Sequence, residues 1–290
     1  MLPGLVRSMR PKQWIKNGFI YAALVFDGQL GNTPALLVTT LGFALFCLAT
    51  SSIYLINDIR DLAEDRQHPT KRNRPLPSGR LPVSAAWAAA GAFGGVAIVG
   101  GFLLDREFGW IVLSYVALFI LYSFRLKHVP ILDVFAIAAG FVLRVAAGVA
   151  LITVVRFSPW LYVCTTLLAL FLGFGKRRAE LSLLAESAGQ HRRVLDGYTL
   201  PLLDQLIVVV CSATIMAYSL YTFSAENVPK NHLMMLTIPF VAYGIFRYLW
   251  LIHVEDAGGA PDELLLSDRP LLLTFLLWGA AAVGALYLGT

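Results

Sequence analysis

Residues 34–57 read PALLVTTLGFALFCLATSSIYLIN, an apolar stretch without one charged side chain, and they decide the fold. A helix of about 20 apolar residues is long enough to cross the hydrocarbon core of a bilayer. Asp58 follows directly and begins a polar segment. The stretch therefore predicts a membrane-spanning helix with a charged segment at its end.

The composition extends this prediction to the whole chain. Hydrophobic residues make up 58% of its 290 residues and charged residues only 14%, whereas soluble domains carry about 25% charged residues. We therefore expect an all-α integral membrane protein of nine transmembrane helices, folded as one domain over residues 1–290. The other eight predicted spans are 15–29, 83–104, 108–125, 131–154, 158–176, 200–223, 232–253 and 270–289.

The basic residues predict the orientation of these spans. Nine spans place the two termini on opposite sides, and only Arg106, Arg156 and Lys230 fall on the side away from the N-terminus. Because cytoplasmic loops carry the excess of Lys and Arg, we expect a cytoplasmic N-terminus and an external C-terminus in a multi-pass plasma-membrane protein. The long loops at about 58–82 and 177–199 are then cytoplasmic, and we expect them to carry the functional site.

The strongest chemical signal is residues 57–65, NDIRDLAED. On a helix Asp58, Asp61 and Asp65 fall within an arc of about 60°. Three carboxylates on one face repel one another unless a cation joins them, and Mg²⁺ prefers oxygen ligands that it shares with substrate phosphates. The motif predicts a Mg²⁺ site, with an ordinary solvated helix bearing surface acids as the alternative.

Cations follow these carboxylates directly, in residues 65–80, DRQHPTKRNRPLPSGR. Carboxylates that hold a metal, next to Lys and Arg that neutralise phosphate oxygens, are what a metal–diphosphate complex requires. The excess of cytoplasmic cations alone would also place charges here, but it does not explain the close succession of Asp and Arg.

The pattern Asn57-Asp58-x-x-Asp61-x-x-x-Asp65, followed by Lys71-x-x-Arg74-Pro75, resembles the first signature of the UbiA superfamily of intramembrane prenyltransferases. The resemblance covers essentially the whole chain and implies nine helices around a central cavity. Further segments are similar to the decaprenyl-phosphate phosphoribosyltransferase branch: 10–17 (RPKQWIKN), 122–128 (YSFRLKH), 175–181 (GKRRAEL), 261–263 (PDE) and 268–269 (DR). That branch joins polyprenyl phosphate to C1 of 5-phosphoribosyl diphosphate (PRPP), releases diphosphate and serves cell-wall arabinan synthesis.

The chain departs from the wider superfamily at its second acidic motif. Where other members carry aspartates, this chain reads Lys176-Arg177-Arg178-Ala179-Glu180. The departure puts a second metal site in doubt. It favours substrates with more phosphate groups, as PRPP and a lipid phosphate have.

The resemblance implies the following roles. Asn57, Asp58, Asp61 and Asp65 form the catalytic group, the three aspartates being ligands of Mg²⁺. The expected partners are PRPP, a polyprenyl phosphate lipid and the membrane, with a second copy of the chain as an open alternative and nucleic acid not expected. The expected substrate-binding residues are Lys12, Lys16, Lys71, Arg74, Arg80, Tyr122, Lys127, Arg144, Lys176, Arg177, Arg178 and Glu180.

Arg144 lies near the middle of the predicted span at 131–154. A charge in the membrane interior is costly and normally faces a partner or a wet cavity. Asp133 lies almost three turns earlier on the same helix face. Arg144 is therefore expected either to contact a phosphate or to form a structural ion pair with a buried acid such as Asp133, and the sequence favours neither.

Two other functions remain open. One is a prenyltransferase that moves a polyprenyl group from its diphosphate to an aromatic acceptor, as in quinone synthesis. The other, more distant, is a transporter that uses charges near the membrane midplane. The Lys176–Arg178 cluster argues for PRPP, and the gathering of acids at one membrane edge argues for an enzyme.

Overall fold

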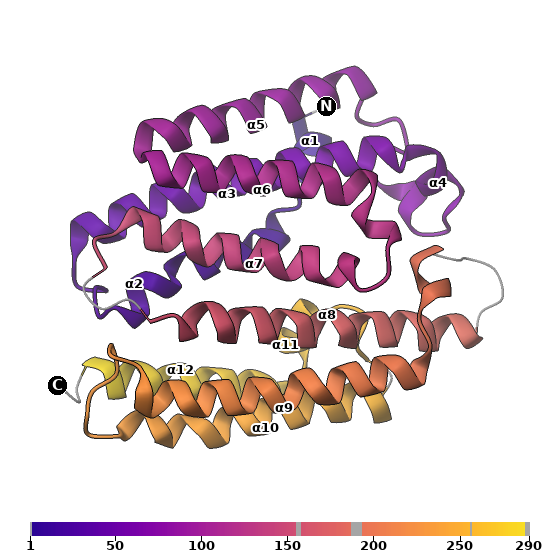
Figure 1. Cartoon of the computed structure of the whole chain (residues 1–290). Coiled ribbons are helices and arrows are strands. Elements are labelled where there is room, and N and C mark those ends of the chain that lie inside the picture. Colours follow the sequence, from indigo (N-terminus) through magenta and orange to yellow (C-terminus); the bar gives the residue numbers. More distant parts are fainter. Residues whose placement is uncertain (1, 155–157, 187–192, 256, 288–290) are drawn as a thin grey trace. The chain divides into compact units, whose positions relative to one another are not determined.

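The computed structural model describes residues 2–154, 158–186, 193–255 and 257–287, and this part of the chain is helical, with twelve α-helices and short 3₁₀ helices (Figure 1). Seven helical segments within it are long and apolar enough to cross a membrane. They are Thr33–Arg60 (α3), Val83–Leu104 (α5), Arg106–Phe124 (α6), Leu132–Leu151 (α7), Leu200–Ser224 (α9), Leu233–Val254 (3₁₀ helix η5, Leu233–Thr237, with α10, Ile238–Val254) and Arg269–Tyr287 (α12).

The predicted span at 15–29 is not one continuous α-helix. The 3₁₀ helix η1 (Pro11–Tyr21) and the short helix α2 (Ala22–Phe26) stand in its place, after the short N-terminal helix α1 (Leu2–Ser8). The segment contains Asn17, whose buried side chain bonds to α3, so that one side of it is polar.

Residues 160–176 of the predicted span at 158–176 lie in α8 (Trp160–Glu186), a 27-residue helix whose later turns carry the Lys176–Glu180 motif. Nine spans and the membrane topology stay predictions. Arg156, loop residues 187–192 and the end of the last predicted span, 288–289, lie outside the described residues.

The chain forms two compact units, each built from segments far apart in the sequence. The first unit comprises residues 1–24, 29–125 and 143–154, and its main packing is α3 against α5, with α6 alongside. Phe46, Phe108 and Tyr115 lie in its core. Gly94 permits the close approach of α5 to α3, because a Cβ there would lie 3.0 Å from Ser52 Oγ.

The second unit comprises residues 25–28, 126–142 and 155–290. In it α8 packs on α9, while α10 packs on α12 together with α11 (Pro261–Ser267). Phe171, Phe174 and Leu203 lie in its core. Helix α7 contributes residues to both units, and the prediction of a single domain stays a prediction.

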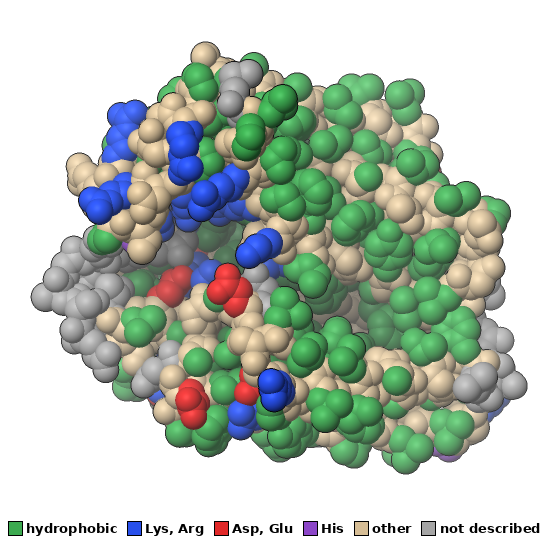
Figure 2. Space-filling view, turned by 180° about the vertical axis from the view of Figure 1, so that it is seen from behind, with side chains coloured by type: hydrophobic (Ala, Val, Ile, Leu, Met, Phe, Trp, Pro, Cys, Tyr) green, Lys and Arg blue, Asp and Glu red, His purple; other side chains and the backbone are tan. Residues whose placement is uncertain are grey.

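Large apolar side chains are exposed along the helices. Leu103, for example, is 82% exposed, and Val209 and Leu236 are also exposed. Figure 2 shows hydrophobic side chains covering much of one face, with Lys and Arg gathered in a limited part of it. Apolar surface of this extent is rare on soluble monomers and suits contact with lipid.

Candidate functional site

The candidate site begins where α3 leaves its apolar run. Helix α3 ends at Arg60 and α4 (Leu62–Gln67) begins two residues later, with Asp61 between them at φ −87° and ψ 9°. The Asp61 N–H donates to Asn57 O at 2.9 Å, and the Asp65 N–H donates to Asp61 O at 2.8 Å. Residues 58–65 thus belong to two helices that meet at Asp61, and not to the single helix on which the arc of about 60° is reckoned.

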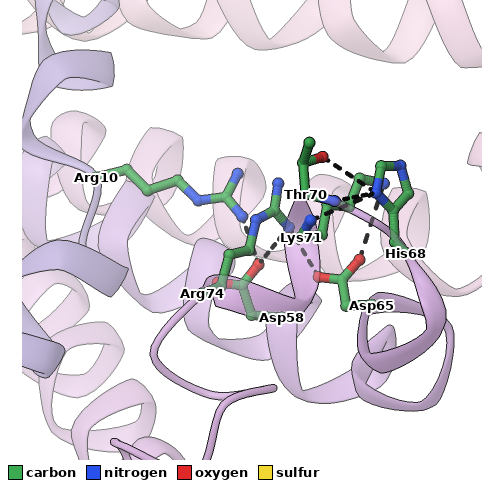
Figure 3. Close-up of polar contacts among 7 residues, drawn as sticks. All are labelled: Arg10, Asp58, Asp65, His68, Thr70, Lys71 and Arg74. Atoms are coloured by element: carbon green, nitrogen blue, oxygen red, sulfur yellow. Dashed lines mark hydrogen bonds and ion pairs between the residues drawn. The ribbon is translucent and has the colours of Figure 1, made fainter.

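Asp58 and Asp65 nevertheless come together across this break, because one guanidinium joins them. Arg74 Nη1 lies 2.8 Å from Asp65 Oδ2 and 3.4 Å from Asp58 Oδ1 (Figure 3). Lys71 Nζ lies 3.8 Å from Asp65 Oδ1. Both carboxylates are buried. Because a buried charge is costly unless it is paired, these cations offset part of the cost of burying the two carboxylates.

Arg10 is a member of this cluster that the sequence prediction missed. Its guanidinium forms a hydrogen-bonded ion pair with Asp58 Oδ1 and lies over the Tyr54 ring, 4.8 Å from the centroid. Its backbone is left-handed, with φ 55°, which is uncommon outside glycine and typical of functional or strained positions. The residue opens segment 10–17, for which only Lys12 and Lys16 were predicted to contact substrate.

The loop after α4 is shaped by His68. Its Nδ1 accepts from the backbone N–H groups of Thr70 at 3.3 Å and Lys71 at 3.4 Å, just before the 3₁₀ turn η2 (Lys71–Asn73). Partial burial, and next the Lys71 charge, lower the pKa of His68 below its ordinary value, in agreement with an accepting Nδ1. This turn presents Lys71 to Asp65.

Arg80 has a local role instead. Its Nε donates to Ser78 Oγ at 2.9 Å, and its guanidinium also bonds to Asn73 O. The side chain is thus turned back onto its own loop, and its predicted contact with substrate stays a prediction.

The residues of the acidic cluster fit a magnesium ion. Across the described ranges, no three Asp, Glu, His or Cys side chains gather as a ready metal site. Mg²⁺ needs only one or two carboxylates, however, since waters and substrate phosphates complete its coordination. Asp58 and Asp65 supply two buried carboxylates that already share one cationic group, and Asp61 is half-buried between them in the sequence.

Arg144 is buried in the first unit and bonds to the side chains of Asn17 and Tyr115. Its Nε donates to Asn17 Oδ1 at 2.9 Å and its Nη2 to the Tyr115 hydroxyl at 2.7 Å. The guanidinium carbon also lies 4.9 Å from the centre of the Tyr115 ring. Through these contacts Arg144 of α7 links η1 and α6, which is a structural role.

Arg177 is the centre of a buried ion-pair network in the second unit. Only 1% of the residue is exposed. Its Nε lies 2.6 Å from Asp133 Oδ2 and its Nη1 lies 2.5 Å from Glu180 Oε2. Asp133, considered above as a partner for Arg144, thus pairs with Arg177. The sequence predicts that Arg177 contacts a substrate phosphate, and that contact stays a prediction. In this structure its guanidinium pairs with the internal acids Asp133 and Glu180.

Tyr198 completes this network. Its hydroxyl donates to Asp133 Oδ1 at 2.7 Å and accepts from the Ile131 N–H at 2.5 Å. Burial and then the hydrogen bond to Asp133 raise the pKa of Tyr198 well above its ordinary value, so the hydroxyl remains a donor.

Arg178 also has an internal acid partner. Its Nε lies 2.7 Å from Asp204 Oδ1, and its Nη1 donates to Ile252 O at 2.9 Å. Two of the three cations in the Lys176–Arg178 motif are therefore paired within the protein. The charge of this motif alone does not distinguish PRPP from a prenyl diphosphate.

The remaining predicted residues are placed as follows. Lys12 is exposed and Lys16 half-buried on η1, and Lys176 is half-buried on α8. Tyr122 packs its ring 5.9 Å from that of Phe119 on α6, and Lys127 lies in the 3₁₀ turn Leu126–His128. Their contacts with substrate stay predictions.

Comparison with known proteins gives a consistent result across the chain. The sequence pattern of the UbiA prenyltransferase family matches residues 18–267. A protein of Corynebacterium glutamicum named decaprenyl-phosphate phosphoribosyltransferase is 34% identical over 98% of this chain and 87% of its own length. A protein of the same name from Mycolicibacterium smegmatis is also 34% identical to this chain, over 99% of this chain and 93% of its own length.

Solved structures agree at the level of the fold. A UbiA homolog from Archaeoglobus fulgidus, bound to DMAPP and Mg²⁺, superposes with a TM-score of 0.73 over 97% of this chain and 98% of its own. The same homolog bound to GPP and Mg²⁺ also gives 0.73. Sequence identity to both is 19%, so this likeness concerns the fold alone.

Proposed function

This chain belongs to the UbiA prenyltransferase family, and from that premise we propose that it is a Mg²⁺-dependent phosphoribosyltransferase. It transfers the 5-phosphoribosyl group of PRPP to a polyprenyl phosphate, of which decaprenyl phosphate is the expected form, and releases diphosphate. The product serves synthesis of decaprenyl-phosphoarabinose for cell-wall arabinan, as the resemblance to that branch implies.

The observation that carries the diphosphate chemistry is the buried acid pair with its cations. Asp58 and Asp65 lie beside the end of an apolar helix, and Arg10, Lys71 and Arg74 contact them. A site at the membrane edge that brings carboxylates and guanidinium groups together suits a diphosphate with a bound metal ion. The choice of PRPP rests on the near-full-length relatives, because the Lys176–Arg178 motif is largely paired internally.

In this proposal Asp58, Asp61 and Asp65 are the residues that would hold the metal. The chemistry that a bound Mg²⁺ supplies is stabilisation of the charge that builds on the leaving diphosphate. Arg74, Lys71 and Arg10 neutralise the remaining phosphate oxygens, and their placement before the reaction lowers the cost of reorganisation. The backbone carbonyl of Asn57 accepts a hydrogen bond from the Asp61 N–H, and this bond helps to fix the metal-binding turn.

The bond changes need no strong general base. The C1–O bond of PRPP breaks, and its electron pair leaves with the diphosphate. An oxygen of the lipid phosphate, already anionic at pH 7, forms the new bond to C1 from the opposite face. We therefore expect inversion at C1. The Nδ1 of His68 is occupied with the loop backbone, and this scheme assigns His68 no proton transfer.

One experiment separates this function from the alternatives. The purified protein is incubated with Mg²⁺ and either PRPP with decaprenyl phosphate, or a polyprenyl diphosphate with an aromatic acid, and lipid products are identified by mass spectrometry. We expect decaprenyl-phosphoribose phosphate and diphosphate from the first mixture only. A prenylated aromatic product would favour the quinone-type alternative, and no product from either would favour a transporter.

A further inference from the structure

The acid pair of the first unit carries counter-cations that are more accessible than the acids. The carboxylate side chains of Asp58 and Asp65 are only 2% and 4% exposed. The side chains of Arg10, Arg74 and Lys71 are 27%, 34% and 44% exposed. The acids are therefore fixed within the protein, and the cations form the layer that an arriving ligand meets first (Figure 3).

This arrangement affects a metal ion and a metal–diphosphate complex differently. Mg²⁺ alone meets positive charges and reaches Asp58 and Asp65 only if the guanidinium groups of Arg10 and Arg74 give them up. Those groups would then lose their partners, at a free-energy cost. A diphosphate that arrives with the metal offers them new charged acceptors, to which arginine binds in a bidentate manner.

We propose that Arg10 and Arg74 are exchange partners: they neutralise Asp58 and Asp65 in the ligand-free site and transfer to diphosphate oxygens when metal and diphosphate bind together. The site is consequently selective for the metal–diphosphate complex over either component alone. This inference rests on the proposed function, which places a diphosphate at this cluster.

The anchoring of η1 makes the exchange a side-chain movement. Trp14 Nε1 donates to Ser51 Oγ at 3.2 Å, and Asn17 Nδ2 lies 3.3 Å from Cys47 Sγ, so η1 is bonded to α3 along its length. Arg10 precedes this anchored helix, and the Tyr54 ring gives its guanidinium a second attractive surface. Its side chain can therefore turn from carboxylate to phosphate while the backbone stays in place.

The experiment measures binding to the purified full-length protein by titration calorimetry, with MgCl₂ alone, diphosphate alone in chelator, and both together. In the unmodified protein we expect Mg²⁺ to bind at least about tenfold more tightly when diphosphate is present. Diphosphate should bind more tightly by the same factor when Mg²⁺ is present. In Arg10→Met, Mg²⁺ alone should bind about tenfold more tightly, because a like charge is removed. The metal–diphosphate complex should bind about tenfold more weakly.

Arg7→Met is the matched control, because Arg7 is an exposed arginine three residues earlier in the chain. It should leave all three affinities within about twofold of the unmodified protein. Arg10→Lys serves if the methionine variant does not fold, as judged from its ligand-free unfolding temperature. That variant keeps the charge but loses the two-pronged donor, so Mg²⁺ alone should bind as before and the complex more weakly.

The outcomes separate this inference from the proposed function. If Arg10→Met leaves Mg²⁺ affinity unchanged, or weakens Mg²⁺ alone and the complex equally, the exchange is wrong while diphosphate binding stands. If the unmodified protein binds no diphosphate in the presence of Mg²⁺, the proposed function itself fails.

Discussion

At the residue scale, the candidate site depends on two buried carboxylates whose charges are balanced by the chain itself. Asp58 and Asp65 share Arg74, and Asp58 also binds Arg10. Replacing either carboxylate by its amide leaves cations that are partly exposed, at 27–44%, and that water can solvate. The function of each acid can therefore be tested separately from insertion of the protein in the membrane.

Asp65→Asn should lower PRPP-dependent release of diphosphate by at least about 100-fold, because it removes a metal ligand and the strongest partner of Arg74. The amount of protein extracted from membranes should not change. The control is Glu64→Gln, which neutralises the exposed neighbouring acid. Activity of Asp65→Asn near that of the control would exclude Asp65 as a ligand.

Arg177→Met should destabilise the protein without acting on the metal. The substitution leaves Asp133 and Glu180 without their guanidinium in a buried network, a change that typically costs about 3–5 kcal/mol. We expect a lower unfolding temperature in detergent and partial recovery in the double variant Arg177→Met/Asp133→Asn. Arg178→Met, at a more accessible ion pair, should have a smaller effect. If the Arg177→Met protein has normal stability but a greatly raised KM for PRPP, then Arg177 binds substrate.

At the element scale, η1 is the part of the fold that most affects the site. Arg10 directly precedes it, and it is bonded to α3 through Trp14 and Asn17. Near its end the backbone is close to α7, where a Cβ on Gly148 would lie 1.9 Å from Ile20 O. Since that neighbour is backbone, a larger residue at 148 must move η1 or α7.

Gly148→Ala should therefore reduce the free energy of unfolding by about 1–3 kcal/mol, the usual range for overpacking. The measurement is denaturant or thermal unfolding in detergent. Gly91→Ala on α5 is the control, because nothing lies within 4 Å of a Cβ at that position. Equal stability of the two variants would show that η1 does not pack on α7 in this way.

The elements differ in how far the sequence predicts them. The uncharged run at 34–57 is long enough to indicate α3 on its own, and the Asp spacing indicates a cation site directly. The 3₁₀ form of residues 11–21 could not be read from composition, because polar partners on α3 stabilise it. Arg10 and Asp58 are 48 residues apart, and Arg177 and Asp133 are 44 apart. A count of charges cannot tell which cations face ligands and which are paired internally.

At the scale of the whole molecule, the membrane orientation stays a prediction. The excess of Lys and Arg places residues 58–82 in the cytoplasm and Lys230 outside. In a background lacking Cys47, Cys164 and Cys211, a cysteine at Ser78 should resist an impermeant thiol reagent added to intact cells. A cysteine at Lys230 should react. Both positions are exposed, and the reverse labelling pattern would place the acid pair on the external face.

The central claim is that the Asp58–Asp65 cluster is where diphosphate binds. A cryo-EM or crystal structure of the protein with Mn²⁺ in place of Mg²⁺ and with diphosphate tests it most directly. We predict metal density in contact with Asp65, bridged to a diphosphate that Arg74 also contacts. Diphosphate bound away from this cluster, with the Arg74–Asp65 ion pair still closed, would contradict the account.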